Sequence, residues 1–364
     1  MRAAFRVLHR YLSLAAVALW SLQAVTGVML VFHWELDDWS VAGSARPLQP
    51  AAFSQALDGM LAARPGDVLD GVYPSGGDRG RFDVLLDRPD GKTDVLRVDG
   101  QGQVLRQRPW NYDKPHLGLF QIATYLHQTL FAHQPGRWLI GLSGLLLLSN
   151  LCMGLVLAWP RAGQWGRLLM PPKAPRAAMA VHGWHRAAGL WLAAPAALLV
   201  LAGVVMAFDV PLQALFDARA TPGTASAAAE PLAVHPIGAG QVIATALTRY
   251  PGASLAALEP PGPGAPWWSV KVRQAGEWRR VQGTTTLYVS SRSGRILADY
   301  DALKAPMRTR VWDSLYALHT GEAGGLAGRW IVELIGLWLT GMCALGLSLW
   351  WLRRRLRRSR KDVA

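Results

Sequence analysis

The chain has 364 residues, 51% of them hydrophobic, with 17 tryptophans and a formal net charge of +14. This composition is too apolar and too rich in tryptophan for an ordinary soluble protein of this length. The charge alone would suit a nucleic-acid-binding protein. The basic residues, however, gather at the two ends and in one middle segment, so we expect a lipid bilayer and no nucleic acid as partner.

Four apolar stretches are each long enough to cross a bilayer, which takes about 20 residues. They are residues 11–32, 138–159, 187–208 and 330–352. The first is longer than the apolar part of a secretory signal peptide, so we expect a retained helix. Cys152 and Cys343 both lie inside these stretches, which predicts no external disulfide.

Basic residues flank the stretches on one side only. The N-terminus, residues 160–186 and the C-terminal tail are rich in Arg and Lys and almost free of acids, whereas the two long connections are nearly balanced. This is the positive-inside pattern, and it predicts a multi-pass protein of the bacterial inner membrane with both termini in the cytoplasm.

The predicted organisation follows the chain. It has a first span with a cytoplasmic N-terminus (1–33), a first periplasmic domain (34–136), a second span (137–159) and a basic cytoplasmic loop (160–186). A third span (187–208), a second periplasmic domain (209–328), a fourth span (329–352) and a basic cytoplasmic tail (353–364) complete it.

The two halves of the chain resemble each other. "LHRYLSLAAVALWSLQAVTGVMLVF" aligns with "WHRAAGLWLAAPAALLVLAGVVMAF" at an offset of 176, and "LHQTLFAHQPGRW" aligns with "LHTGEAGGLAGRW" at an offset of 192. The linker-like stretch 221–230 accounts for much of the difference. Both halves run in the same direction, which predicts two parallel repeats and a four-helix bundle whose glycines allow close helix packing.

Each long connection has a helical pattern followed by strands with glycine turns. A helix and strands that end in "G-x-(V/I)-L" resemble the PepSY domain. With the motifs "LHRYLSL", "WHRAAGL", "LHTGEAGGLAGRW" and "ALGLSLWWLRRR", nearly the whole chain resembles the PepSY-associated transmembrane family. The expected fold is therefore an α+β membrane protein: a four-transmembrane-helix bundle of two parallel repeats, each with an external PepSY-like α+β domain.

Four of the nine histidines obey the repeat. His9 and His185 lie at the cytoplasmic ends of the first and third spans, and His127 and His319 precede the second and fourth spans at the external side. Two facing imidazoles are the axial ligands that a b-type haem uses, and bundle cores hold such cofactors. We therefore expect two haem b, one per pair. The simpler interpretation of histidines at a membrane interface is anchoring.

Other residues are candidates for supporting roles. Arg10, Arg186, Arg137 and Arg329 follow the repeat and could bind haem propionates or only snorkel to the interface. His182, three residues before His185, could replace it as ligand. Glu333 could pair with Arg329 or handle protons. His33 and His133 could line a substrate path, although the repeat does not support His33 as a ligand.

The family resemblance implies an activity but does not fix it. Some members are inner-membrane siderophore-iron reductases with two b haems, which implies a ferric siderophore as substrate and an oxidoreductase acting on iron. The donor would be quinol or a cytoplasmic reductant, because no nicotinamide or flavin motif is evident. The alternative is a membrane-anchored PepSY regulator of a periplasmic peptidase, not an enzyme. A transporter is the weakest possibility.

Overall fold

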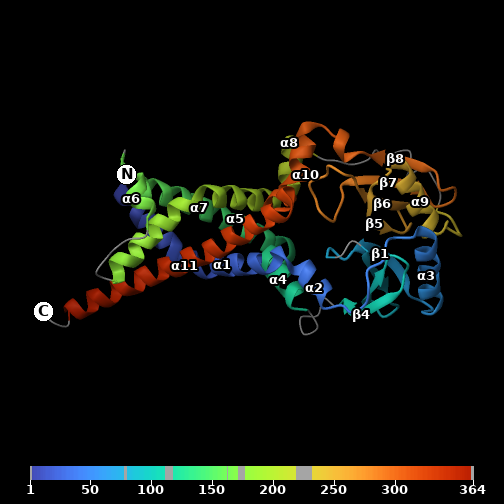
Figure 1. Ribbon diagram of the computed structural model, residues 1–364, viewed down its shortest axis with the longest axis horizontal. Coiled ribbons are helices and arrows are strands. Elements are labelled where there is room, and N and C mark those ends of the chain that lie inside the picture. Colours follow the sequence, from blue (N-terminus) through green and yellow to red (C-terminus); the bar gives the residue numbers. More distant parts are fainter. Residues whose placement is uncertain are drawn as a thin grey trace. The chain divides into compact units, whose positions relative to one another are not determined.

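The protein divides into two compact units in a computed structural model that describes residues 2–77, 80–110, 118–161, 163–170, 177–218 and 232–361 (Figure 1). The helical unit contains Met1–Val31, Phe120–Leu212 and Leu318–Ala364, and the sheet unit contains Phe32–Leu119 and Gln213–Ala317. The predicted linker 221–230 lies outside the described residues.

Four long helices make up most of the helical unit. They are α1 (Arg2–Val31), α5 (His133–Ala158), α7 (Ala177–Ala207) and α11 (Gly325–Lys361). All four are long and apolar enough to cross a membrane, so the protein has four candidate membrane helices, and each contains most of one predicted span. The helices α1 and α7 begin well before their apolar stretches, so His9 and His185 lie within helices rather than in loops.

The four helices pack as a ring. The helix α1 packs against α5 and α11, and α7 packs against the same two helices, so α1 faces α7 across the bundle. Glycines make this packing close. A Cβ on Gly141 would lie 2.6 Å from the Phe208 ring, and a Cβ on Gly336 would lie 2.7 Å from the Val28 side chain.

The sheet unit contains one antiparallel sheet of eight strands in the order β4-β3-β2-β1-β5-β6-β7-β8. The first four are β1 (Val68–Pro74), β2 (Arg81–Asp87), β3 (Thr93–Asp99) and β4 (Val104–Trp110). The second four are β5 (Ser254–Glu259), β6 (Trp267–Arg273), β7 (Thr285–Ser290) and β8 (Ile296–Tyr300).

The two halves of this sheet meet where β1 pairs with β5 at Val72 and Leu258. The two long connections, predicted as two separate PepSY-like domains, thus contribute to one compact unit with a continuous sheet. From the β1–β5 junction the strands run outward in chain order on both sides, because each consecutive strand pairs with the one before it.

Two helices cover one face of the sheet with an apolar core. The helices α3 (Pro50–Ala62) and α9 (Ala239–Arg249) pack against each other. Their buried side chains join the inward-facing residues of the strands in one hydrophobic cluster. Along β2 and β6, buried residues alternate with less buried ones. A Cβ on Gly240 would lie 2.6 Å from the Pro50 carbonyl oxygen, so glycine permits this helix contact.

Short helices connect the long helices with the sheet. The helices α2 (His33–Trp39) and α8 (Asp209–Phe216) follow α1 and α7, while α4 (Leu119–Gln128) and α10 (Met307–His319) precede α5 and α11. The short helix α6 (Trp165–Leu169) lies between α5 and α7. The order of long helix, short helix, helix, four strands, helix and long helix is found twice along the chain.

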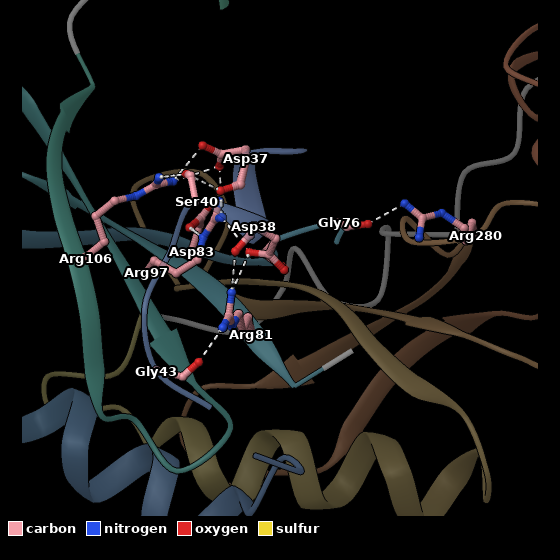
Figure 2. Close-up of polar contacts among 11 residues, drawn as sticks. Asp37, Asp38, Ser40, Gly43, Gly76, Arg81, Asp83, Arg97, Arg106 and Arg280 are labelled. Carbon is pink, nitrogen blue, oxygen red and sulfur yellow. Dashed lines mark hydrogen bonds and ion pairs between the residues drawn. The ribbon is translucent and has the colours of Figure 1, made fainter. Parts of the chain in front are cut away.

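A buried ion network fixes α2 to the sheet (Figure 2). The guanidinium of Arg97 makes two hydrogen bonds of 2.7 and 2.8 Å to Asp83 and one of 2.7 Å to Asp38 on α2. Arg81 donates to the Asp38 carbonyl at 2.7 Å, and Arg106 binds both oxygens of Asp37. Charged hydrogen bonds of this kind are about twice as strong as neutral ones, so they hold α2 on β2, β3 and β4.

Candidate functional site

The first predicted pair lies inside the bundle. His9 on α1 faces His185 on α7, and their ring centroids are 6.3 Å apart with an angle of 63° between the ring planes. The two helices lie opposite each other in the ring of four, so the imidazoles approach across its core. His182 is exposed on the same helix, and it is His185 that meets His9.

The second pair has the same spacing. His127 and His319 lie in the last turns of α4 and α10, and their ring centroids are also 6.3 Å apart, with an interplanar angle of 42°. Burial, together with the neighbouring His319, lowers the pKa of His127 to about 4. Its ring is therefore neutral at pH 7, which is the form that binds a metal.

The spacing of 6.3 Å matches two axial ligands of one metal ion. An imidazole nitrogen lies about 2.0 Å from a bound first-row metal and about 1.1 Å from its own ring centroid. Two imidazoles on opposite sides of the metal therefore have centroids roughly 6.2 Å apart. Both pairs meet this value, although they come from different helices.

Each of the four histidines lies against a glycine of a neighbouring long helix. A Cβ on these glycines would lie within 4 Å of a histidine Cε1. The four contacts are Gly27 with His127 at 3.1 Å, Gly203 with His319 at 2.8 Å, Gly154 with His9 at 3.4 Å and Gly346 with His185 at 3.6 Å. The missing side chains let the rings lie directly on the helix backbone.

Hydrogen bonds to this exposed backbone orient three of the rings. Nδ1 of His127 lies 3.1 Å from the Gln23 carbonyl, that of His319 lies 3.0 Å from Leu199, and that of His9 lies 3.2 Å from Asn150. A carbonyl only accepts, so Nδ1 carries the proton and Nε2 keeps its lone pair. This is the arrangement by which backbone carbonyls orient metal-binding histidines.

One ring has a further polar neighbour, and the fourth ring lacks the hydrogen bond of the other three. The Thr26 hydroxyl lies 3.1 Å from Nδ1 of His127 and itself donates to the Leu22 carbonyl at 2.7 Å. Nδ1 of His185 is buried without a hydrogen-bond partner. The carbonyl that corresponds to that of Asn150 belongs to Met342, and no hydrogen bond joins it to His185.

The four predicted arginines have other partners in this structure. Arg137 donates to the Met206 carbonyl at 2.9 Å and Arg329 donates to that of Val31 at 2.5 Å, both at the C-terminal ends of long helices. Arg186 lies 3.3 Å from the Ala158 carbonyl at the end of α5. Cations at these positions complement the helix dipole. Binding of haem propionates by these arginines stays a prediction.

Arg10 and Arg137 complete this picture. The exposed Arg10 guanidinium lies 4.6 Å from the ring centroid of Tyr11. Arg137 also makes an ion pair of 3.3 Å with Asp209. Within the described part of the chain, neither side chain makes a hydrogen bond to one of the paired imidazoles.

The remaining candidates are not part of either pair. His33 begins α2 and its ring lies 5.0 Å from that of Trp34, whereas His133 begins α5 with a positive φ of 49°. One carboxylate oxygen of Glu333 is buried without a hydrogen-bond partner. The ion pair expected between Glu333 and Arg329 is not formed.

These residues fit a planar, four-coordinate metal cofactor better than a bare ion. Within the described part of the chain, no group of three or more His, Cys, Asp or Glu is arranged to hold a metal ion. Two facing histidines would supply two ligands, and a macrocycle such as haem would supply the other four. Sequence analysis found these histidines, but it did not identify the glycines as their neighbours.

The fold and these pairs define a multi-span membrane protein with an α+β sheet unit. The chain belongs to the family described as the PepSY-associated TM region, which it matches over residues 6–353. The search of curated proteins found no match.

Proposed function

We propose that the protein is a membrane electron-transfer protein with two haem b, one held by His9 and His185 and the other by His127 and His319. The observation that carries this proposal is the repeated centroid spacing of 6.3 Å in both pairs. Interfacial anchoring would not require two histidines to face each other, still less twice at the same distance.

A bound haem supplies a centre that takes up and releases one electron. The chain fixes the ligands through the glycine contacts and the Nδ1 hydrogen bonds, and its apolar helices keep water away. His9 and Gly27, the neighbour of His127, are 18 positions apart on α1, or about 27 Å along the helix. The two pairs therefore lie near opposite faces of a hydrocarbon core of about 30 Å.

We infer further that the chain is a duplication of two parallel repeats. The glycines support this, since Gly27 and Gly203 differ by the same 176 positions as His9 and His185. Gly154 and Gly346 differ by 192, as do His127 and His319. Glycines that match in sequence thus also make the same kind of contact with a histidine. The strand order is likewise the same on both sides of the β1–β5 junction.

The same proposal gives the orientation in the membrane. The basic residues at the N-terminus, in the middle loop and in the tail favour a cytoplasmic location for these segments. The sheet unit then lies on the periplasmic side of a bacterial inner membrane.

The proposed reaction is reduction of a ferric siderophore at the periplasmic face. One electron per iron comes from quinol or a cytoplasmic reductant, which is oxidised, and it converts Fe(III) to Fe(II). Hard oxygen ligands bind Fe(II) less tightly, so the iron is released. The substrate rests on the family resemblance, whereas the cofactor rests on the histidine geometry.

The test is an absorption spectrum of the detergent-purified full chain, oxidised and then reduced by dithionite, with haem measured per chain. We expect reduced b-type bands and two haems per chain. Correctly folded protein without haem from haem-replete cells would refute the proposal. It would favour the membrane-anchored regulator of a peptidase.

Histidine variants test the pairing. Replacing His127 and His319 by alanine should remove one haem, and replacing His9 and His185 should remove the other. His235→Ala is the matched control, because His235 is exposed in the sheet unit and should leave both haems in place. Equal loss in the control and in the paired variants would contradict the assignment.

A further inference from the structure

The second half of the sheet has one long connection between strands that the first half lacks. The strands β6 and β7 are joined by the 11 residues 274–284, whereas β2 and β3, at the corresponding places in the other half of the sheet, are joined by the 5 residues 88–92. A tight turn is enough to join antiparallel neighbours. The longer connection, called here the β6–β7 loop, therefore needs another explanation.

A buried carboxylate holds this loop in one conformation. Glu277 accepts hydrogen bonds from the backbone N–H of Gln274 at 3.0 Å and of Thr284 at 2.6 Å, and from the Thr285 hydroxyl at 2.8 Å. A Cβ on Gly283 would overlap the Val272 carbonyl, so the loop returns close to β6. A loop with such internal support is preorganised and presents its outer side chains in fixed places.

The outer side of the loop presents an aromatic residue and two arginines. Trp278 is 54% exposed. The Arg279 guanidinium lies 4.7 Å from the ring centroid of Tyr316 on α10. Arg280 is already engaged, because it binds Glu35 at 2.9 Å and the Gly76 carbonyl (Figure 2).

Arg279, by contrast, keeps unused binding capacity. Its Nε is buried without a hydrogen-bond partner, and the side-chain hydrogen bond that it makes within the described residues is a long one of 3.5 Å to Gln282. Across the described residues it forms no ion pair. The nearby Asp313 accepts instead from the Tyr300 hydroxyl at 3.2 Å. An arginine stacked on an aromatic ring with free donors is suited to an anionic, planar ligand.

We propose that Trp278, Arg279 and Tyr316 form the receiving site for the electron acceptor, and that this acceptor is an anionic ferric chelate with aromatic rings. The guanidinium binds the anionic oxygens of the chelate, and the two aromatic side chains contact its rings. The proposal rests on the proposed function for the reduction itself, but the binding does not depend on it.

The position of Tyr316 on α10 fits this role. Tyr316 lies three residues before His319 on the same helix, a rise of about 4.5 Å. A chelate held against Tyr316 is thus bound to the helix that carries a proposed haem ligand.

A redox-inert chelate separates binding from reduction. We would titrate the purified full chain in detergent with the gallium(III) tris-catecholate complex, which has the charge and shape of the ferric complex but accepts no electron. Binding is measured by calorimetry. Arg279→Gln should weaken binding at least tenfold, because hydrogen bonds to charged groups contribute about that factor, and Trp278→Ala should weaken it several-fold.

Arg292→Gln is the matched control. Arg292 is an exposed arginine in the turn between β7 and β8, so this variant removes the same charge from the same unit and should bind as the wild type does. The proposal is overturned if the wild type does not bind the chelate, if Arg279→Gln and Trp278→Ala both bind normally, or if Arg292→Gln weakens binding as much. Binding that depends on Arg279 in a protein without haem would support this site while the proposed function failed.

Discussion

Replacing Gly203 by alanine would place a methyl group against the imidazole of His319. The added Cβ would lie 2.8 Å from Cε1 and 3.2 Å from Nδ1 of that ring. Carbon atoms in contact prefer a separation of at least about 3.5 Å, so the ring must move by about 0.7 Å. Metal–ligand distances tolerate only about 0.2 Å. We therefore expect Gly203→Ala to lose the haem of the His127–His319 pair.

The other three glycines extend this into a graded series. The corresponding distances are 3.1 Å for Gly27, 3.4 Å for Gly154 and 3.6 Å for Gly346. The required ring displacement thus falls from about 0.4 Å to about 0.1 Å and then to none. Haem loss should follow this order, and Gly346→Ala should keep both haems.

The assay is haem per chain and the reduced spectrum of each purified variant. Gly341→Ala is the control, because a Cβ at Gly341 on α11 meets no described atom within 4 Å. Alanine is favoured over glycine within a helix by roughly 0.5–1 kcal/mol, so helix destabilisation cannot explain a loss. The reasoning is refuted if Gly203→Ala keeps as much haem as Gly341→Ala, or if Gly346→Ala loses as much as Gly203→Ala.

Two further predictions concern the sheet unit. The side chain of Arg97 is 3% exposed, so Arg97→Gln should lower the free energy of unfolding by about 3–5 kcal/mol, because it leaves buried carboxylates without a partner. Arg88→Gln is the control: it removes the exposed ion pair of Arg88 with Asp90 and should change the free energy of unfolding by about 1 kcal/mol at most. Denaturant unfolding in detergent measures both variants. Burial opposes ionisation of Asp37, but the hydrogen bond from Arg106 and nearby arginine charges lower its pKa below the ordinary value. The contribution of Asp37 to stability is therefore present above the pKa of about 3.9 of the unfolded chain and is lost as the pH falls through the lower pKa of the folded protein. The midpoint of denaturant unfolding should thus fall more steeply below about pH 4 in the wild type than in Asp37→Asn. Equal slopes in the two proteins would contradict this assignment.

The membrane helices could be predicted from the sequence, whereas the sheet could not be predicted in full. Runs of about 20 apolar residues identify a span locally. The joining of β1 to β5 depends on Val72 and Leu258, which are far apart in the chain, and no local pattern records which strand edges meet. The short helix α2 is likewise fixed by tertiary contacts, such as the Arg97 ion pairs.

The histidine partners could be predicted because the repeat carries long-range information. The constant offset of 176 between His9 and His185 indicates equivalent places in two copies, and the structure brings these rings together. Gly27 and Gly203 share that offset, so the same signal was available for the glycines. Their packing against His127 and His319 could not be predicted, because helix rotation decides which face meets the ring.

The sheet, whose strands run outward in chain order on both sides of the β1–β5 junction, has a consequence for how such a chain could arise. A protein that corresponds to the first half of this chain would leave the β1 edge open. It would carry His9 and His127 but would lack their partners, His185 and His319. Two copies related by a twofold axis would close the edge and complete both pairs at once. In the proposed duplication, fusion freed the copies to diverge: the first half now holds the Arg97 ion pairs, and the second holds the β6–β7 loop.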